Sequence, residues 1–127
     1  ITSVTATEVV DNDILKQRIA LSKKWLSSTP EHFYTLQLSL VDSSDSVKLE
    51  QLLKKYAVQF GAENIYLYPT KLANQNRFGI VYNSFDRREN AWTMRKELAE
   101  SAAYKAQLRT IEGLKAEMQR SQSENLW

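Results

Sequence analysis

The sequence of 127 residues has no cysteine, one histidine, three glycines and two prolines. Without cysteine the chain can form neither a disulfide framework nor a thiolate nucleophile. A single histidine, His32, excludes a multi-histidine metal site and a histidine–cysteine dyad. Three scattered glycines do not make a glycine-rich phosphate loop. We therefore expect neither enzymatic activity nor a cofactor or metal.

Long hydrophobic runs are also missing. No apolar segment approaches the ~18 residues of a membrane span, and no signal peptide is recognisable. The chain begins with Ile1 rather than Met, so we expect a piece cut from a longer protein, from which any targeting segment has been removed. We expect no direct membrane insertion of this piece.

Charge of one sign does not dominate. Lys and Arg number 17 and Asp and Glu number 15, which gives a net charge of +2. Charge alone therefore indicates neither nucleic acid nor an anionic membrane as a partner. The hydrophobic content of 43% is that of a globular chain, and the length fits about one domain with a packed core.

Hydrophobic periodicity predicts helices alternating with strands. Helices are expected over residues 8–28, 46–60, 86–102 and from 111 onward, and strands over 33–41, 65–68, 77–82 and 106–110. This order predicts an α+β fold of the ferredoxin-like or RNP type, β-α-β-β-α-β, with flanking N- and C-terminal helices. Its four-stranded antiparallel sheet carries two helices on one face and has the first and third strands at its centre. We place a helical extension at 1–31, the domain at 32–110, and a C-terminal helix and tail at 111–127.

The N-terminal helix carries two apolar stripes more than 100° apart. The first comprises Val10, Ile14, Leu21 and Trp25, and the second comprises Leu15, Ile19 and Leu26. Either both stripes are buried within this domain, or the second is covered by another chain or by the rest of a larger protein. We expect Trp25 to anchor the helix to the domain and Trp92, on a later helix, to be a core residue.

The segment 33–41 alternates apolar and polar residues in the way typical of a strand. Period-two alternation places Thr35, Gln37 and Ser39 on one face of the sheet. In the predicted topology this face is opposite the two helices, and it is open unless a terminal helix covers it. Tyr66, Tyr68, Arg77, Gly79 and Val81 are expected on the same face. An amide such as Gln37 both donates and accepts hydrogen bonds, which suits a neutral polar ligand.

Three segments of the chain resemble the SPOR (sporulation-related repeat) domain of bacterial envelope proteins. The segment 34–38, Tyr-Thr-Leu-Gln-Leu, is similar to its first strand. The third strand with Ser84-Phe85 and the helix after it, and residues 104–109, Tyr-Lys-Ala-Gln-Leu-Arg, are similar to its second half. SPOR domains of cell-division proteins, and those attached to secretion and pilus-assembly ATPases, show this pattern. The resemblance covers about residues 32–110.

The resemblance implies binding without catalysis, in the periplasmic part of an inner-membrane or envelope-associated protein. The ligand of SPOR domains is the peptidoglycan glycan strand without stem peptides, bound on the open sheet face. Gln37 matches the family's strand-one glutamine, and Tyr104 stands where relatives have a sugar-stacking Trp. Arg77 replaces another Trp, which removes an aromatic platform. Asn83 replaces a turn glycine but tolerates positive φ.

The predicted glycan site therefore consists of one polar and one aromatic set, with a cation. Thr35, Gln37 and Ser39 would bind hydroxyl and N-acetyl groups, Tyr66, Tyr68 and Tyr104 would pack on sugar rings, and Gly79 lies between them. Arg77, with Lys71 nearby, is expected to pair with a lactyl carboxylate, because Arg binds carboxylates bidentately.

Two alternatives remain. The double-striped N-terminal helix could make this a protein-interaction module that dimerises or docks on the parent protein. An RNA-recognition domain has the same topology, but its third-strand motif is matched only at Phe78, Gly79 and Val81. RNA is thus the weaker alternative, and we expect no nucleic acid partner.

Overall fold

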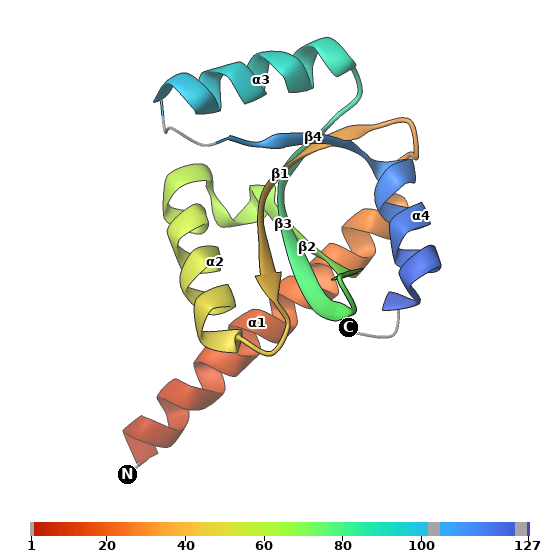
Figure 1. Cartoon of the computed structure of the whole chain (residues 1–127). Coiled ribbons are helices and arrows are strands. Elements are labelled where there is room, and N and C mark those ends of the chain that lie inside the picture. The colour runs from red at the N-terminus through yellow and green to blue at the C-terminus, as the bar shows by residue number, and fades with distance from the viewer. Residues whose placement is uncertain (1, 102–104, 124–126) are drawn as a thin grey trace.

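The protein has one four-stranded antiparallel sheet with the strand order β2-β3-β1-β4 (Figure 1). The structure, a computed structural model, describes residues 2–101, 105–123 and 127. Its elements are α1 (Thr2–Ser28), β1 (Tyr34–Asp42), α2 (Ser46–Phe60), η1 (Ala62–Asn64), β2 (Ile65–Leu72), β3 (Gln75–Phe85), α3 (Arg88–Ser101), β4 (Gln107–Thr110) and α4 (Ile111–Ser121). The predicted α+β class and β-α-β-β-α-β order, with the first and third strands central, are confirmed.

Local sequence signals explain the ends of α2. The Asp45 side chain accepts a hydrogen bond from the backbone N–H of Lys48 at 3.1 Å and so caps the first turn. At the other end, Gly61 adopts a φ of 89° and its N–H donates to the Ala57 carbonyl. A left-handed residue is favourable there only because glycine has no Cβ.

Several expected boundaries are wrong. Residues 69–76, which lie between the expected strands 65–68 and 77–82, belong to a hairpin in which β2 and β3 run up to Ala73 and Asn74, at φ 51° and 63°. Such a two-residue turn matches the twist of the flanking strands. Pro69 is tolerated within β2 because β2 is an edge strand. The N-terminal helix begins at Thr2 instead of residue 8.

Asn83 lies inside β3 rather than in a turn. Its φ is 55°, the positive value that the sequence allowed for. The register shifts here, because Tyr34 pairs with Phe85 whereas Leu36 pairs with Tyr82. The extra residue is a β-bulge, which bends the strand.

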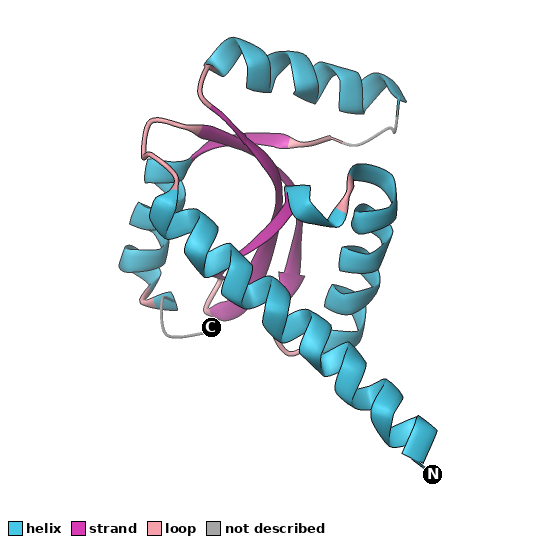
Figure 2. Cartoon of the chain, turned by 180° about the vertical axis from the view of Figure 1, so that it is seen from behind, coloured by secondary structure: helices cyan, strands magenta, loops and turns pink. Residues whose placement is uncertain are grey.

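Helices pack on both faces of the sheet. We call one face the α2 face, because α2 and α3 cover it and bury residues such as Leu36 and Ile80 there. The opposite one is called the Gln37 face, and α4 lies against it (Figure 1). The view from behind shows α1 passing diagonally across the molecule, with its N-terminal part extending away from the sheet (Figure 2).

The C-terminal half of α1 shields the edge strand β2. Trp25 is only 9% exposed and stacks on Tyr66, with ring centroids 4.3 Å apart, so its expected role as an anchor is confirmed. The buried hydroxyl of Ser22 accepts the N–H of Leu67 in β2 at 2.8 Å. This contact satisfies an edge-strand donor that would otherwise be free to pair with another chain.

Both predicted stripes of α1 contribute to the domain. Trp25 and Leu26 are buried among residues of the Gln37 face, whereas Leu15 and Ile19 pack against the core of the α2 face. Leu21, which was assigned to the first stripe, is 50% exposed. Val10 and Ile14 lie where side chains are not described.

Trp92 is not a core residue, contrary to expectation. Its side chain is 51% exposed on α3. The inward side of this helix is formed by Ala91 and Leu98, which are buried, with Met94 beside them. Trp92 follows Ala91 directly, so it points about 100° away around the helix and leaves the core.

Candidate functional site

The Gln37 face carries a polar cluster at its centre. The hydroxyl of Tyr68 donates to Gln37 Oε1 at 2.6 Å, and Arg109 Nη1 donates to the same oxygen at 2.8 Å. Arg109 Nη1 also lies 3.2 Å from the Tyr68 hydroxyl, and its Nη2 lies 3.4 Å from a carboxylate oxygen of Glu117. Four elements, β1, β2, β4 and α4, thus meet through one hydrogen-bonded group, which we call the Gln37 cluster.

This cluster can form because Gly79, on the intervening strand β3, has no side chain. Tyr68 on β2 must reach across β3 to contact Gln37 on β1. Gly79 is its direct partner on β3. A Cβ at Gly79 would lie 2.1 Å from Cε1 of the Tyr68 ring. The phenol ring therefore occupies the space where any other residue would have a side chain.

The Gln37 face is covered, not open. Ile111, Leu114 and Met118 of α4 are buried against it, together with Trp25, Leu26, Tyr68 and Val81. The helix begins directly after β4, where the Thr110 hydroxyl accepts the N–H of Gly113 at 3.0 Å and caps it. The expected C-terminal helix is thus present, and it occupies the place that the sequence interpretation left for a ligand.

Six of the predicted site residues share this face: Thr35, Gln37, Tyr66, Tyr68, Arg77 and Gly79. Gln37 and Gly79 lie there with Tyr68, and Tyr66 lies beneath Trp25 of α1. Thr35 is fully buried, and its hydroxyl is used within the sheet, since it donates to the Asn83 carbonyl at 2.6 Å at the bulge of β3. Tyr104 lies outside the described residues.

Ser39 lies on the opposite face from the one expected. A second bulge, in β1, makes Gln37 pair with Val81 and Ser39 with Ile80, so that Leu38 is the extra residue. After this bulge the alternation is inverted, and the hydroxyl of Ser39 hydrogen-bonds that of Tyr56 on α2.

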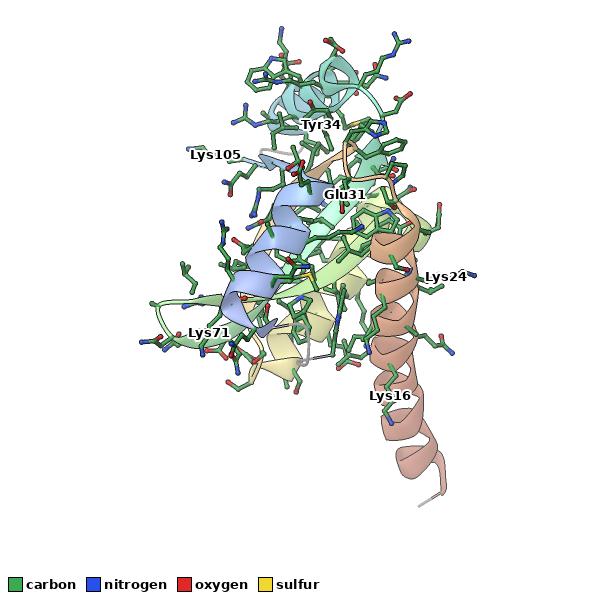
Figure 3. The ribbon with its side chains drawn as sticks, turned by 90° about the vertical axis from the view of Figure 1, so that its right-hand side faces the viewer. Lys16, Lys24, Glu31, Tyr34, Lys71 and Lys105 are labelled. Carbon is green, nitrogen blue, oxygen red and sulfur yellow. The ribbon has the colours of Figure 1, made fainter. Side chains whose placement is uncertain are left out.

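Arg77 shares the face but is remote from the Gln37 cluster. It lies four residues along β3 from Val81, the partner of Gln37, a distance of about 13 Å in a strand. Its Nη2 donates to Gln75 Oε1 at 2.9 Å, and its strand partners are Asp42 and Thr70. The pKa of Asp42 is lowered, first by the backbone N–H of Ser44 and to a smaller extent by Arg77. Figure 3 shows Lys71 close to this end, at the β2–β3 hairpin.

Sequence reasoning missed Arg109 and Glu117. Arg109 pairs with Thr35 across β1 and β4, so it stands on the Gln37 face. Its place in the predicted last strand, alternating with Leu108, was a signal that could have indicated this. Glu117 gave no such signal, because its contact depends on where α4 packs.

Burial raises the pKa of the Tyr68 hydroxyl above the ordinary value of 10.0, although neighbouring Arg109 opposes the shift. The folded protein therefore keeps this proton at a pH where the unfolded chain has begun to lose it. The resulting contribution to the free energy of unfolding is complete below pH 10.0 and is lost as the pH rises toward the folded-state pKa.

We expect the Tyr68→Phe variant to lose stability less steeply than the wild type between about pH 9 and pH 11, by up to about 1.4 kcal/mol per pH unit. Urea unfolding across this range measures the difference. Tyr34→Phe, which removes a hydroxyl elsewhere in the sheet, is the control. Parallel decline of the wild type and Tyr68→Phe would show that Tyr68 does not carry the pH dependence.

Within the described part of the chain, no group of three His, Cys, Asp or Glu side chains could hold a metal ion. The described helices include none long and apolar enough to cross a membrane. Comparison with protein-family models, curated proteins and solved structures finds no match to this chain.

Proposed function

We propose that this domain binds, without catalysis, peptidoglycan glycan strands that lack stem peptides. In this role it localises a larger envelope protein to the division site or to a secretion or pilus apparatus in the periplasm. The ligand comes from the resemblance of residues 32–110 to SPOR domains, and the fold is the one that this resemblance implies.

The observation that carries the proposal is the assembly of Gln37, Tyr68 and Gly79 at the centre of one sheet face. An amide and a phenol hydroxyl offer neutral donors and acceptors for sugar hydroxyl and N-acetyl groups. Arg109 adds a guanidinium beside them, which fits a lactyl carboxylate better than the remote Arg77 does.

Binding at this face requires α4 to move. Returning Ile111, Leu114 and Met118 to water costs about 1.5–3 kcal/mol for each side chain, or about 5–9 kcal/mol together. Since every 1.4 kcal/mol is a factor of ten in affinity, docked α4 lowers the affinity of this face by about three to six orders of magnitude. The position of α4 therefore decides whether the face binds.

Retention on peptidoglycan sacculi, before and after an amidase removes the stem peptides, tests this proposal. A Leu114→Asp variant places a charge in the buried contact of α4, and Gln119→Asp places the same charge on its exposed side as the control. We expect amidase-treated sacculi to retain Leu114→Asp at least about tenfold better than the wild type or Gln119→Asp, because the face is uncovered.

Adding Gln37→Ala to Leu114→Asp should abolish the gain. Circular dichroism must first show that Leu114→Asp keeps its sheet. If folded Leu114→Asp is retained no better than the wild type, or if Gln37→Ala leaves its retention unchanged, the sheet face is not the glycan site.

A second function, interaction with another protein through α1, has an observation of its own. The N-terminal part of α1 extends beyond the rest of the domain (Figures 1 and 2), and Leu21 is half exposed further along this helix. Absence of retention on any sacculi, combined with a dimer in size-exclusion chromatography with light scattering, would favour this function over glycan binding.

A further inference from the structure

An exposed tryptophan on α3 lies beside the guanidinium of an arginine. Trp92 is 51% exposed, and Cζ of Arg95 lies 5.0 Å from the centre of its ring. The Nε of Arg95 donates to the Ala106 carbonyl at 2.7 Å, just before β4. This bond fixes the guanidinium over the indole and uses one of its five N–H groups, while the other four belong to the two Nη atoms.

A surface hollow of about 430 Å³ lies beside this pair, between α3 and the segment that enters β4. It is lined by Trp92, Arg95, Lys96, Ala99, Lys105 and Ala106. All three charged residues of this lining are cations. We call this hollow the Trp92 groove. Figure 3 shows Lys105 at the start of β4, beneath α3 in that view.

Trp92 also lines a second hollow, of about 380 Å³, with Arg88, Glu89 and Thr93. The indole therefore stands between two adjoining depressions on the outside of α3. A linear molecule made of several rings can lie across both depressions, with one of its rings stacked on the indole.

We infer that the Trp92 groove binds a carboxylate-bearing sugar of a glycan strand, as a site separate from the sheet face. The identity of the glycan rests on the proposed function. An exposed indole offers an apolar platform for the C–H face of a sugar ring, and Arg and Lys donate charge-assisted hydrogen bonds to a carboxylate. A glycan that has lost its stem peptides presents this combination, because each lactyl group ends in a free carboxylate.

The position of the groove makes it independent of α4. α3 packs on the α2 face through Leu98 and Leu36, whereas α4 covers the Gln37 face. Binding in the groove therefore avoids the cost of displacing α4. The net charge of only +2 disfavours nucleic acid, which requires an extended basic surface.

Isothermal titration of the whole chain with two soluble probes tests the inference. The first probe is glycan released from amidase-treated peptidoglycan, and the second is an N-acetylglucosamine oligomer, which has similar rings but no carboxylate. The variants are Trp92→Ala, the double variant Lys96→Gln/Lys105→Gln, and Lys48→Gln as a control that removes an exposed cation on α2.

We expect Trp92→Ala to weaken binding of both probes by about tenfold or more, since stacking on the indole serves either one. Lys96→Gln/Lys105→Gln should weaken only the carboxylate-bearing glycan to this extent, and Lys48→Gln should bind like the wild type. Because Trp92 and both lysines are exposed, these variants should keep the wild-type fold, which circular dichroism verifies.

Other outcomes overturn the inference. If the wild type binds the glycan but the groove variants bind it equally well, the Trp92 groove is not a site, and the proposed function stands. If only Leu114→Asp binds, the sheet face is the sole site. If neither protein binds, both proposals fail. Polyglutamate serves as a further probe: if it binds the wild type as tightly as the glycan does, the ligand of the groove is an acidic peptide instead of a sugar.

Discussion

Replacing Gly79 with alanine is expected to lower the free energy of unfolding by about 3 kcal/mol. The new Cβ would lie 2.1 Å from Cε1 and 2.6 Å from Cζ of Tyr68. The ring cannot stay, because these atoms belong to a rigid side chain that is 1% exposed. Moving it also removes the hydrogen bond to Gln37 and disturbs the position of Arg109. Urea denaturation measures the change.

Gly113→Ala is the matched control. The Cβ there would lie 2.8 Å from the Thr110 hydroxyl, which must turn away and weaken its cap on the Gly113 N–H. The loss of about 1 kcal/mol from the cap is offset by the preference of about 1 kcal/mol for alanine over glycine within a helix. We expect this variant to change the stability by less than about 1 kcal/mol. In the background of Tyr68→Leu, which lacks the phenol ring, Gly79→Ala should cost clearly less than it does alone. Equal costs for the two glycines would contradict the contact between Gly79 and Tyr68.

Much of the fold follows from local patterns, because those patterns have local causes. The limits of α2 were predictable from an N-cap aspartate and a terminal glycine, Asp45 and Gly61. The strand order could be predicted because few topologies connect this sequence of elements. The β2–β3 hairpin was missed because Ala73 and Asn74 lack the Asn-Gly or Asp-Gly signal that identifies such turns.

The candidate site was harder to predict than the fold. Simple alternation put Gln37 and Ser39 on one face, but the bulge at Leu38 separates them, and no local signal in the sequence identifies that bulge. The apolar positions of α4 were visible as Ile111, Leu114 and Met118. The surface that these side chains cover could not be predicted, because an apolar stripe shows that one side of a helix is buried but not against which surface it packs. The covering of the Gln37 face by α4 could therefore not be predicted from the sequence.

Replacing Trp25 with alanine is expected to cost about 4 kcal/mol of stability, the second large effect. The indole is 9% exposed and lies parallel to the ring of Tyr66, with an interplanar angle of 4°. It joins α1 to the same buried group as Leu114 and Met118 of α4. Its removal therefore leaves a cavity shared by α1, α4 and the sheet, which urea denaturation should reveal.

Leu21→Ala, on the same helix, is the control for Trp25→Ala. Leu21 is 50% exposed, so its truncation should change the stability by no more than about 0.5 kcal/mol.

The loss of the Trp25 side chain also weakens the docking of α1 on β2. This frees the N–H of Leu67 from the hydroxyl of Ser22 and exposes the edge of β2. An exposed edge strand pairs readily with other chains, so Trp25→Ala should associate as its concentration rises, whereas Leu21→Ala should not. Light scattering over a concentration series separates the two variants. If Trp25→Ala stays monomeric and as stable as Leu21→Ala, α1 neither anchors the domain nor protects its edge, and docking to a partner protein becomes its main role.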